Sequence, residues 1–437
     1  MQSPYTLFTG GYADRSVFSL SFDPTQDEPQ DRLVVTDSLQ HGRASTWLTF
    51  SQDGSKLYTT SEWSEPEGEI KTLTVGSDGL HEDDAGPQAS TGGLWACHTG
   101  LVTSTKPHLL VTANYKGPSL SVVPLQADGT FTGASSFDVL PGRPLGPVTS
   151  RQESAHPHGA HIDPLGRVVV VPDLGTDDLR LFKIKPEALA QPGAPASAAL
   201  EEYDAIHLEA GDGPRHVLFS PVRKSGSSGG GSGGGSGGGD DDEALLYVLN
   251  ELSNSLSVLL VTYPAAPAPA PASASAPTAL PTFTLLQSRI SLLPSSPFPH
   301  QSSFSTWHAA ELVLTPDGRT LIASNRAEGH DPLRGSRDGP RDLLAVFAVA
   351  GDGRIDEGSR RLVECGGRAP RHLSLCSESV TRQGRGDAAV DGGRYLAVAA
   401  HDSDEVVIME RVGADGRELK EVARRQDVGR PGVVVWL

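Results

Sequence analysis

Histidine, arginine and carboxylate side chains recur at corresponding places along the chain, and together they could bind an anion and move protons. They stand where short apolar segments begin or end. The residues concerned are His156, His158, Arg215, His216, Asn250, Glu251, His308, Glu311, Asn325, Arg326, Arg371, His372 and His401. Imidazole and carboxylate groups can serve as general acids or bases, and guanidinium groups bind phosphate or carboxylate. The pattern therefore predicts a site for an anionic small molecule.

These residues belong to a sequence repeat. Each copy holds an apolar strand, a Pro/Gly turn, a second strand that ends in polar residues, and a third strand. Clear copies begin near residues 156, 214, 308 and 370, and looser copies lie around Trp47 and Trp95. A seventh copy combines the N-terminal strands with 432–436. Repeated groups of strands without helices between them predict an all-β fold, a seven-bladed β-propeller in a single domain over 1–437.

The two ends of the chain and two low-complexity stretches complete this picture. Pairing of the first and last strands within one blade would close the ring and remove its exposed edges. Residues 225–243 are rich in Gly, Ser and then acidic residues, and residues 263–281 are rich in Ala, Pro and Ser. Such stretches bury too little apolar surface to offset the entropy of ordering, so we expect disordered loop insertions.

Propeller geometry predicts where the polar residues gather. The first strand of a blade lines the central channel, and the second runs antiparallel beside it. Residues at the start of strand one and the end of strand two therefore share one face near the axis. A single Arg or His at such a position could equally have a structural role, for example by hydrogen-bonding the carbonyl groups of a neighbouring blade, because buried polar groups normally find partners. Convergence of Arg215, Glu251, Arg326 and Arg371 favours a ligand site instead.

Neither a metal nor another cofactor is expected. His156-Pro157-His158 places two imidazoles on one face of an extended strand, a spacing that could chelate a metal. No carboxylate cluster accompanies the pair, which argues against this. Trp47, Trp95 and Trp307 stand at the start of inner strands, where we expect core or rim packing more than ligand stacking.

Composition excludes several classes of protein. The chain has 36 basic and 54 acidic residues, a net charge of −18, which argues against a nucleic-acid partner. No segment approaches the roughly 18 apolar residues of a membrane-spanning helix. The N-terminus lacks the basic and apolar regions of a signal peptide, and three cysteines form no disulfide framework. We expect a cytoplasmic protein without a membrane partner, as a monomer or weak oligomer.

Several segments resemble the seven-bladed propeller lactonases, which include bacterial 6-phosphogluconolactonases and fungal carboxy-cis,cis-muconate cyclases. The resemblance rests on His156–His158, Val171–Gly175, Gly213–His216, Tyr247–Asn254 and Ser324–Arg326. The N-terminal third of the chain matches only in the spacing of its expected strands. In the muconate-cyclising members a His, two Arg and a Glu are implicated in catalysis. The resemblance carries these roles to His158, Arg215, Arg326 and Glu251. The sequences of the His-Pro-His and Asn-Glu-Leu-Ser-Asn motifs look closer to the phosphogluconolactonase branch than to the cyclases.

Three functions stay open. The first is metal-independent hydrolysis of a phosphorylated sugar lactone, with Glu251 or His158 activating water and two arginines holding the phosphate. The second is cycloisomerisation of a carboxylated muconate to its lactone by the same groups. The third is a non-catalytic propeller that only binds a ligand. Residues expected to contribute to substrate binding are His156, His216, Asn250, His308, Glu311, Asn325, Arg371 and His372.

Overall fold

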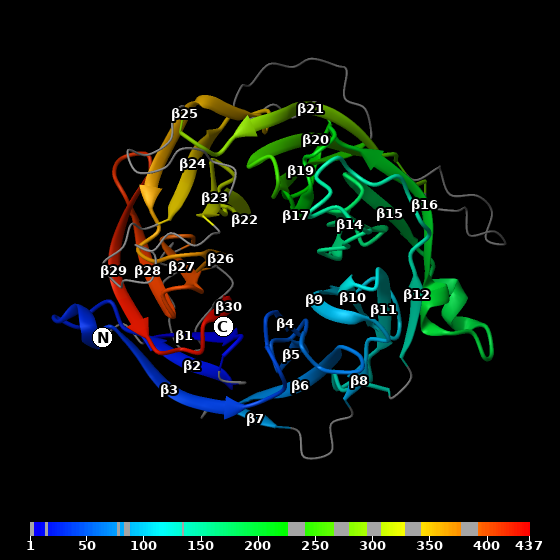
Figure 1. Cartoon of the computed structure of the whole chain (residues 1–437), viewed down its shortest axis with the longest axis horizontal. Coiled ribbons are helices and arrows are strands. Elements are labelled where there is room, and N and C mark those ends of the chain that lie inside the picture. Colours follow the sequence, from blue (N-terminus) through cyan, green and yellow to red (C-terminus); the bar gives the residue numbers. More distant parts are fainter. Residues whose placement is uncertain are drawn as a thin grey trace.

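The strands of the chain form seven antiparallel sheets arranged in a ring around a central axis (Figure 1). The computed structural model describes residues 4–13, 16–76, 79–82, 88–132, 135–225, 241–265, 279–294, 307–327, 342–376 and 392–437. The prediction of an all-β, seven-bladed propeller is confirmed. Within these ranges the helices are three short 3-10 helices, η1 (Pro29–Asp31), η2 (Pro186–Ala190) and η3 (Ala196–Ala199). No helix of the described ranges is long and apolar enough to cross a membrane.

Each blade is named here for its innermost strand, and its strands run from the axis to the rim (Figure 1). The first blades in the chain are β30 (Pro431–Trp436), β1 (Tyr5–Gly11), β2 (Ser16–Phe22), β3 (Leu33–Gln40); β4 (Leu48–Phe50), β5 (Lys56–Ser61), β6 (Glu69–Gly76), β7 (Gly79–Glu82), with β8 (Ala89–Ser90) on β6; and β9 (Leu94–Val102), β10 (Leu109–Lys116), β11 (Ser119–Pro124), β12 (Ser136–Val139). The next are β13 (His161–Ile162), β14 (Val168–Asp173), β15 (Asp178–Ile184), β16 (Leu200–His207); and β17 (Pro214–Phe219), β19 (Asp242–Asn250), β20 (Ser255–Tyr263), β21 (Thr282–Ser291), with β18 (Arg223–Lys224) on β19. The last are β22 (Trp307–Leu314), β23 (Thr320–Ala327), β24 (Leu343–Val349), β25 (Ile355–Glu364); and β26 (Pro370–Leu375), β27 (Tyr395–Ala400), β28 (Glu405–Val412), β29 (Glu418–Gln426).

The apolar cores lie between neighbouring blades, and this explains why middle strands are apolar on both faces. All six residues of β14 are buried. Val168 and Val170 belong to the core shared with the β17 blade, whereas Val169 and Val171 belong to the core shared with the β9 blade. Burial of each such valine contributes roughly 1.5–3 kcal/mol. Alternate residues of this valine run thus pack against the blades on either side, so every position of the run has to be apolar.

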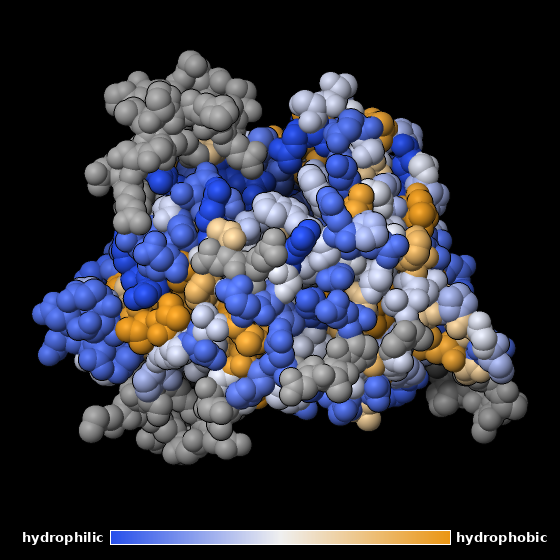
Figure 2. Space-filling model, turned by 60° about the horizontal axis from the view of Figure 1, so that its bottom comes forward, coloured by the Kyte–Doolittle hydropathy of each residue, from blue (hydrophilic) through white to orange (hydrophobic). Residues whose placement is uncertain are grey.

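Rim strands carry the opposite composition. In β25 most residues are exposed or half-buried, and the strand contains acidic and basic side chains. The face seen in Figure 2 is mainly hydrophilic, with hydrophobic residues in small separate groups. The large apolar residues that are exposed include Phe137 and Val139 in β12 and Leu285 in β21, a strand of another blade.

The first and last strands close the ring, as the sequence predicts. β1 pairs antiparallel with β30 from Leu7 opposite Trp436 to Gly11 opposite Pro431. The Thr9 hydroxyl also donates a 2.6 Å hydrogen bond to a carbonyl oxygen of β30. The C-terminal strand is therefore the innermost strand of the blade that the N-terminus completes.

The two insertions fall mostly outside the described residues. Residues 226–240 and 266–278 are not described, so their predicted disorder stays a prediction. The predicted boundaries are wrong at two ends, because Asp242 and Glu243 belong to β19 and Tyr263 ends β20. Asp242 pairs with Tyr263 across these strands, so the hairpin extends further than the composition indicates.

A group of histidine rings surrounds the axis, one from each of several inner strands. His98 of β9 lies 4.0 Å from the ring of Trp47 and 4.4 Å from that of His161, centroid to centroid. His216 and His372 pack against the same Trp47 at 5.4 and 5.1 Å. Burial lowers the pKa of all four histidines, and that of His161 falls to about 4. The rings are therefore neutral in the folded protein at pH 7.

We predict that acid destabilises the fold below about pH 6.5, the pKa of a histidine in an unfolded chain. Between that pH and the lowered pKa the unfolded state binds protons that the folded state does not, so the free energy of unfolding falls as pH falls. Each such histidine contributes a slope of about 1.4 kcal/mol per pH unit. Urea denaturation at pH 7.5, 6 and 5 measures the slope.

The variant His161→Gln provides the control, because glutamine does not titrate. Its unfolding free energy should depend on pH less steeply than that of the natural protein between pH 6.5 and 4, the window set by the lowered pKa of His161. Equal slopes in the two proteins would contradict the prediction.

Candidate active site at one mouth of the channel

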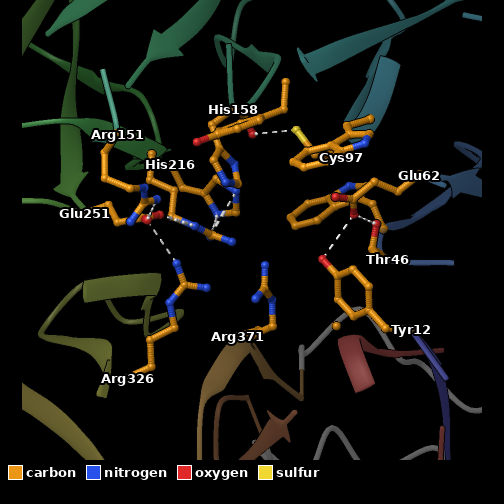
Figure 3. Close-up of a pocket in the computed structure, with 15 residues that line it drawn as sticks. Tyr12, Thr46, Glu62, Cys97, Arg151, His158, His216, Glu251, Arg326 and Arg371 are labelled. Atoms are coloured by element: carbon orange, nitrogen blue, oxygen red, sulfur yellow. Dashed lines mark hydrogen bonds and ion pairs between the residues drawn. The ribbon is translucent and has the colours of Figure 1, made fainter. Parts of the chain in front are cut away.

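A cavity of about 270 Å³ opens at the axis, and residues from all seven blades or the connections between them line it (Figure 3). Its lining consists of Tyr12, Thr46, Trp47, Glu62, Trp95, Cys97, Tyr115, Arg151, His158, Arg215, His216, Glu251, Arg326, Arg371 and Gly432. Six of the residues singled out from the sequence are therefore brought together: His158, Arg215, His216, Glu251, Arg326 and Arg371.

Strand register explains why these residues meet. Arg215 is the second residue of β17, and Glu251 directly follows β19. Pro214 pairs with Asn250, so the start of the inner strand and the end of its neighbour lie at the same edge of the sheet. The β26 blade repeats this arrangement, with Arg371 second in its inner strand.

Glu251 is buried and lies among three arginines. Arg151 donates a hydrogen bond to Oε1 of Glu251, and Nη2 of Arg326 lies 3.1 Å from the same oxygen. Nε of Arg215 lies 3.1 Å from Oε2, although its N–H is not aligned for a hydrogen bond. Burial alone would raise the pKa of Glu251, but the charges of Arg326, Arg151 and Arg215 outweigh it and hold the pKa well below the usual range. The carboxylate is therefore ionised and serves as the counter-ion of three cations.

Arg215 links this cluster to the neighbouring blade. Its Nη1 donates a hydrogen bond to the carbonyl oxygen of Ala310. Burial and the nearby charge of Arg326 lower the pKa of Arg215 to about 10, while Glu251 opposes that change. The guanidinium stays protonated at neutral pH and keeps its charge at the cavity.

His158 faces the same end of the cavity in its neutral form. Its ring lies 5.2 Å from that of His216 and 5.4 Å from that of Tyr115. Burial and the charge of Arg215 hold the pKa of His158 well below its usual range. Its Nδ1 is buried and has no hydrogen-bond partner among the described residues.

A second carboxyl group lies on the other side of the cavity. The hydroxyl of Thr46 donates a 2.6 Å hydrogen bond to Oε2 of Glu62, and the hydroxyl of Tyr12 donates one of 3.1 Å to the same oxygen. Burial raises the pKa of Glu62, and the hydrogen bond from Thr46 and the charge of Arg371 partly oppose this. Arg371 lies between the two carboxyl clusters and over the Tyr12 ring, 5.1 Å from its centroid (Figure 3).

Six residues expected to bind substrate lie outside this lining: His156, Asn250, His308, Glu311, Asn325 and His372. The His156 ring stacks on Tyr115 at 4.3 Å, and its Nδ1 lies 3.0 Å from the Tyr115 carbonyl oxygen. The Asn250 amide donates to the hydroxyls of Ser255 and Ser257 in the adjacent strand. The contacts of His156 and Asn250 are with neighbouring strands, which agrees with the structural role that a single polar residue can have in such a repeat.

Three of the remaining four, His308, Glu311 and His372, contact lining residues from behind. Glu311 lies 3.0 Å from Nδ1 of His216, which orients that ring, and 3.7 Å from Nε2 of His372. Nε2 of His308 lies 3.3 Å from Nη1 of Arg151. Asn325 is buried within β23. The expected contacts of these four residues with a substrate stay predictions.

Sequence reasoning missed several lining residues in the N-terminal blades. Glu62 directly follows β5 as Glu251 follows β19, and Tyr12 directly follows β1. The rule that residues at the end of the second strand face the site would have found both, had it been applied to the blades where the repeat is weak. Trp47 and Trp95, expected to pack in the core or at the rim, also line the cavity. Arg151 precedes the β13 blade and has no counterpart in the repeat.

No metal centre is indicated in the part of the chain that the structure describes. There, no group of three or more His, Cys, Asp or Glu side chains is arranged to hold a metal ion. His156 and His158 contact Tyr115 differently, the first stacked on its ring and the second edge-on.

Comparison with known proteins agrees with this architecture. The sequence model of the family described as "Lactonase, 7-bladed beta-propeller" matches residues 6–436. The chain belongs to this lactonase family. A "Probable 6-phosphogluconolactonase" of Arthroderma benhamiae is 26% identical over 321 residues, 74% of this chain and 66% of that relative. A 6-phosphogluconolactonase of Formosa agariphila is 23% identical over 419 residues, 95% of this chain and 94% of the relative.

A solved structure of similar shape is the periplasmic gluconolactonase of Pseudomonas aeruginosa. It superimposes on this lactonase-family chain with a TM-score of 0.68 at 21% identity, covering 100% of this chain and 99% of the other. At that identity the likeness concerns the fold alone.

We predict that Glu251→Gln strongly destabilises this lactonase-family protein. The substitution leaves three largely buried guanidiniums without their counter-ion, and breaking a buried ion pair in this way costs about 3–5 kcal/mol. Glu410→Gln is the matched control, because Glu410 pairs with a half-exposed Arg394 at 2.6 Å, where the loss should stay below about 1 kcal/mol. Urea denaturation measures both, and equal losses would contradict the assignment of Glu251 as the counter-ion.

Proposed function

We propose that this protein hydrolyses the lactone ring of a phosphorylated sugar, 6-phosphogluconolactone or a close analogue, in the cavity at the channel mouth. One observation carries the proposal: four arginines converge on a cavity in which Glu251 is held as an ionised carboxylate. Membership of the lactonase family and the names of its relatives support hydrolysis of a lactone.

The charge of the cavity favours an anionic substrate. Arg151, Arg215, Arg326 and Arg371 line it, whereas the whole chain carries a net charge of −18. A local positive field within an acidic protein attracts a small anion to that one place. Guanidinium groups bind phosphate oxygens with two parallel hydrogen bonds, so the end of the cavity formed by Arg151, Arg215 and Arg326 would hold the phosphate.

The other parts of the cavity suit the reaction of the ring. If the lactone carbonyl lay near Arg371, the positive charge of the guanidinium would stabilise the negative charge that develops on the carbonyl oxygen when water attacks. The neutral His158 would hydrogen-bond the substrate. Glu251 is a weak base there, because arginines occupy its oxygens and its pKa is low. His158 is also a weak base, because its pKa is low.

The alternatives considered from the sequence fare differently. The names of the relatives reported above, all 6-phosphogluconolactonases, give no support to cycloisomerisation of a muconate. A purely binding propeller is an outcome of the experiment below. The expected cytoplasmic location and monomeric or weakly oligomeric state stay predictions.

The test is hydrolysis of 6-phosphogluconolactone by the purified protein, corrected for spontaneous hydrolysis and repeated with a chelator. We expect acceleration that survives the chelator. Binding of 6-phosphogluconate without any acceleration would favour the purely binding propeller and overturn the proposal.

Arg326→Gln tests the phosphate end of the cavity. Losing a hydrogen bond to a charged group costs about 1.5–3 kcal/mol, so kcat/KM for the phosphorylated lactone should fall about 10- to 100-fold. The same variant should hydrolyse unphosphorylated gluconolactone as the natural protein does, which is the matched control. An equal loss on both substrates would remove Arg326 from phosphate binding.

A further inference from the structure

We propose that Glu62, held in place by Tyr12 and Thr46, is the general base that activates the water for opening the lactone ring. This inference rests on the proposed hydrolysis and names a catalytic group for it that the resemblance does not indicate.

The hydrogen bonds of Glu62 leave one carboxylate oxygen available. Thr46 and Tyr12 both donate to Oε2, at 2.6 and 3.1 Å. The described residues give Oε1 no hydrogen-bond partner, and Glu62 lines the cavity. One oxygen is thus fixed while the other can accept a proton from a water molecule at hydrogen-bond distance, which is the geometry that general-base catalysis requires.

Glu251, the other carboxyl group of the lining, is arranged in the opposite way. Its Oε1 accepts from Arg151 and lies 3.1 Å from Nη2 of Arg326, and Arg215 lies 3.1 Å from its Oε2. A base surrounded by cations binds a proton weakly, and the pKa of Glu251 lies well below the usual range. Glu62 instead has a pKa raised by burial, which brings it closer to the pH at which a base works best.

Other titratable groups of the lining suit the task less well. Burial and the charge of Arg215 lower the pKa of His158. Burial raises the pKa of the Cys97 thiol, whose Sγ lies 3.6 Å from the carbonyl oxygens of Ala113 and His158. Burial also raises the pKa of Tyr115 to about 12, so neither the thiol nor this phenol ionises near neutral pH.

Tyr12 and Thr46 act as positioning residues in this assignment. The Tyr12 ring packs against Trp63 at 5.1 Å and against His401 at 5.0 Å, and Arg371 lies over it. These contacts come from two neighbouring blades, Trp63 after β5 and both His401 and Arg371 from the β26 blade, so the hydroxyl is held toward Glu62. A pre-oriented hydrogen bond fixes the carboxylate without reorganisation during the reaction.

The proposed step balances in atoms and charge. Oε1 of Glu62 takes a proton from water as the water oxygen bonds to the lactone carbonyl carbon. The carbonyl π pair moves to its oxygen beside Arg371. When the tetrahedral intermediate collapses, the bond from carbon to the ring oxygen breaks, and that oxygen takes the proton from Glu62. The product is the open hydroxy acid, which releases one proton to solvent.

Glu62→Gln is the first test, with 6-phosphogluconolactone as substrate and spontaneous hydrolysis subtracted. The amide keeps the shape and cannot accept the proton, so kcat should fall about 10²- to 10⁴-fold with KM changed little. Binding of 6-phosphogluconate by calorimetry, with an unchanged Kd, shows that the variant is folded. Glu201→Gln, at an exposed pair with Lys185, is the matched control and should keep the natural rate.

The pH profile separates a base from a structural residue. Wild-type kcat should rise with pH through the raised pKa of Glu62, and Glu62→Gln should lack that limb. Tyr12→Phe removes a hydrogen bond that lowers the pKa of Glu62, so the limb should move to higher pH. The other groups that interact electrostatically with Glu62 are Arg371, Arg215 and Cys97, and both variants leave them unchanged.

The outcomes distinguish the two proposals. A natural protein that does not accelerate lactone hydrolysis overturns the proposed function and this inference with it. A natural protein that does, combined with a Glu62→Gln variant that keeps kcat and the acid limb, overturns only the inference. If Glu62→Gln does not fold, Tyr12→Phe decides, because an unmoved acid limb contradicts the assignment of Glu62.

Discussion

The ion cluster around Glu251 is the constraint on which the site depends. Three arginines from separate segments, Arg151, Arg215 and Arg326, meet at one buried carboxylate. Guanidinium groups this close would repel one another without a shared counter-ion. The cluster joins these segments through ion pairs, and its three guanidiniums and one carboxylate carry more positive than negative charge. The ion pairs that join these segments therefore also give this end of the cavity its net positive charge.

The two carboxyl groups of the cavity show how environment differentiates identical chemistry. Glu251 meets guanidiniums, whereas Glu62 meets hydroxyls, and burial acts on both. Opposite shifts of pKa in neighbouring acids are how active sites separate an anchoring carboxylate from one that exchanges protons. Arg371 lies between them and faces the Tyr12–Glu62 pair (Figure 3). The cavity thus has a cationic end and an end suited to proton transfer.

The sequence predicted the fold well because blade packing demands a pattern visible in one dimension. Runs such as 168–171 are apolar throughout, since both faces of a middle strand are buried. The site was predicted in part. Strand ends indicated Arg215 and Glu251, but direction within a strand decides whether a residue lines the cavity or packs behind it, as Arg371 and His372 do. Arg151 lies in a connection, where no repeat signals its place.

Closure of the ring by β30 has a consequence for how the protein is made. The strand that completes the first blade also brings Gly432 to the cavity wall, and it pairs with residues more than 400 positions earlier. During synthesis the N-terminal segments emerge first, so the edge of β1 that pairs with β30 stays unpaired until residues 431–436 have been made. The cavity wall is therefore complete only after β30 has been made, and a nascent chain that lacks this strand lacks part of the site.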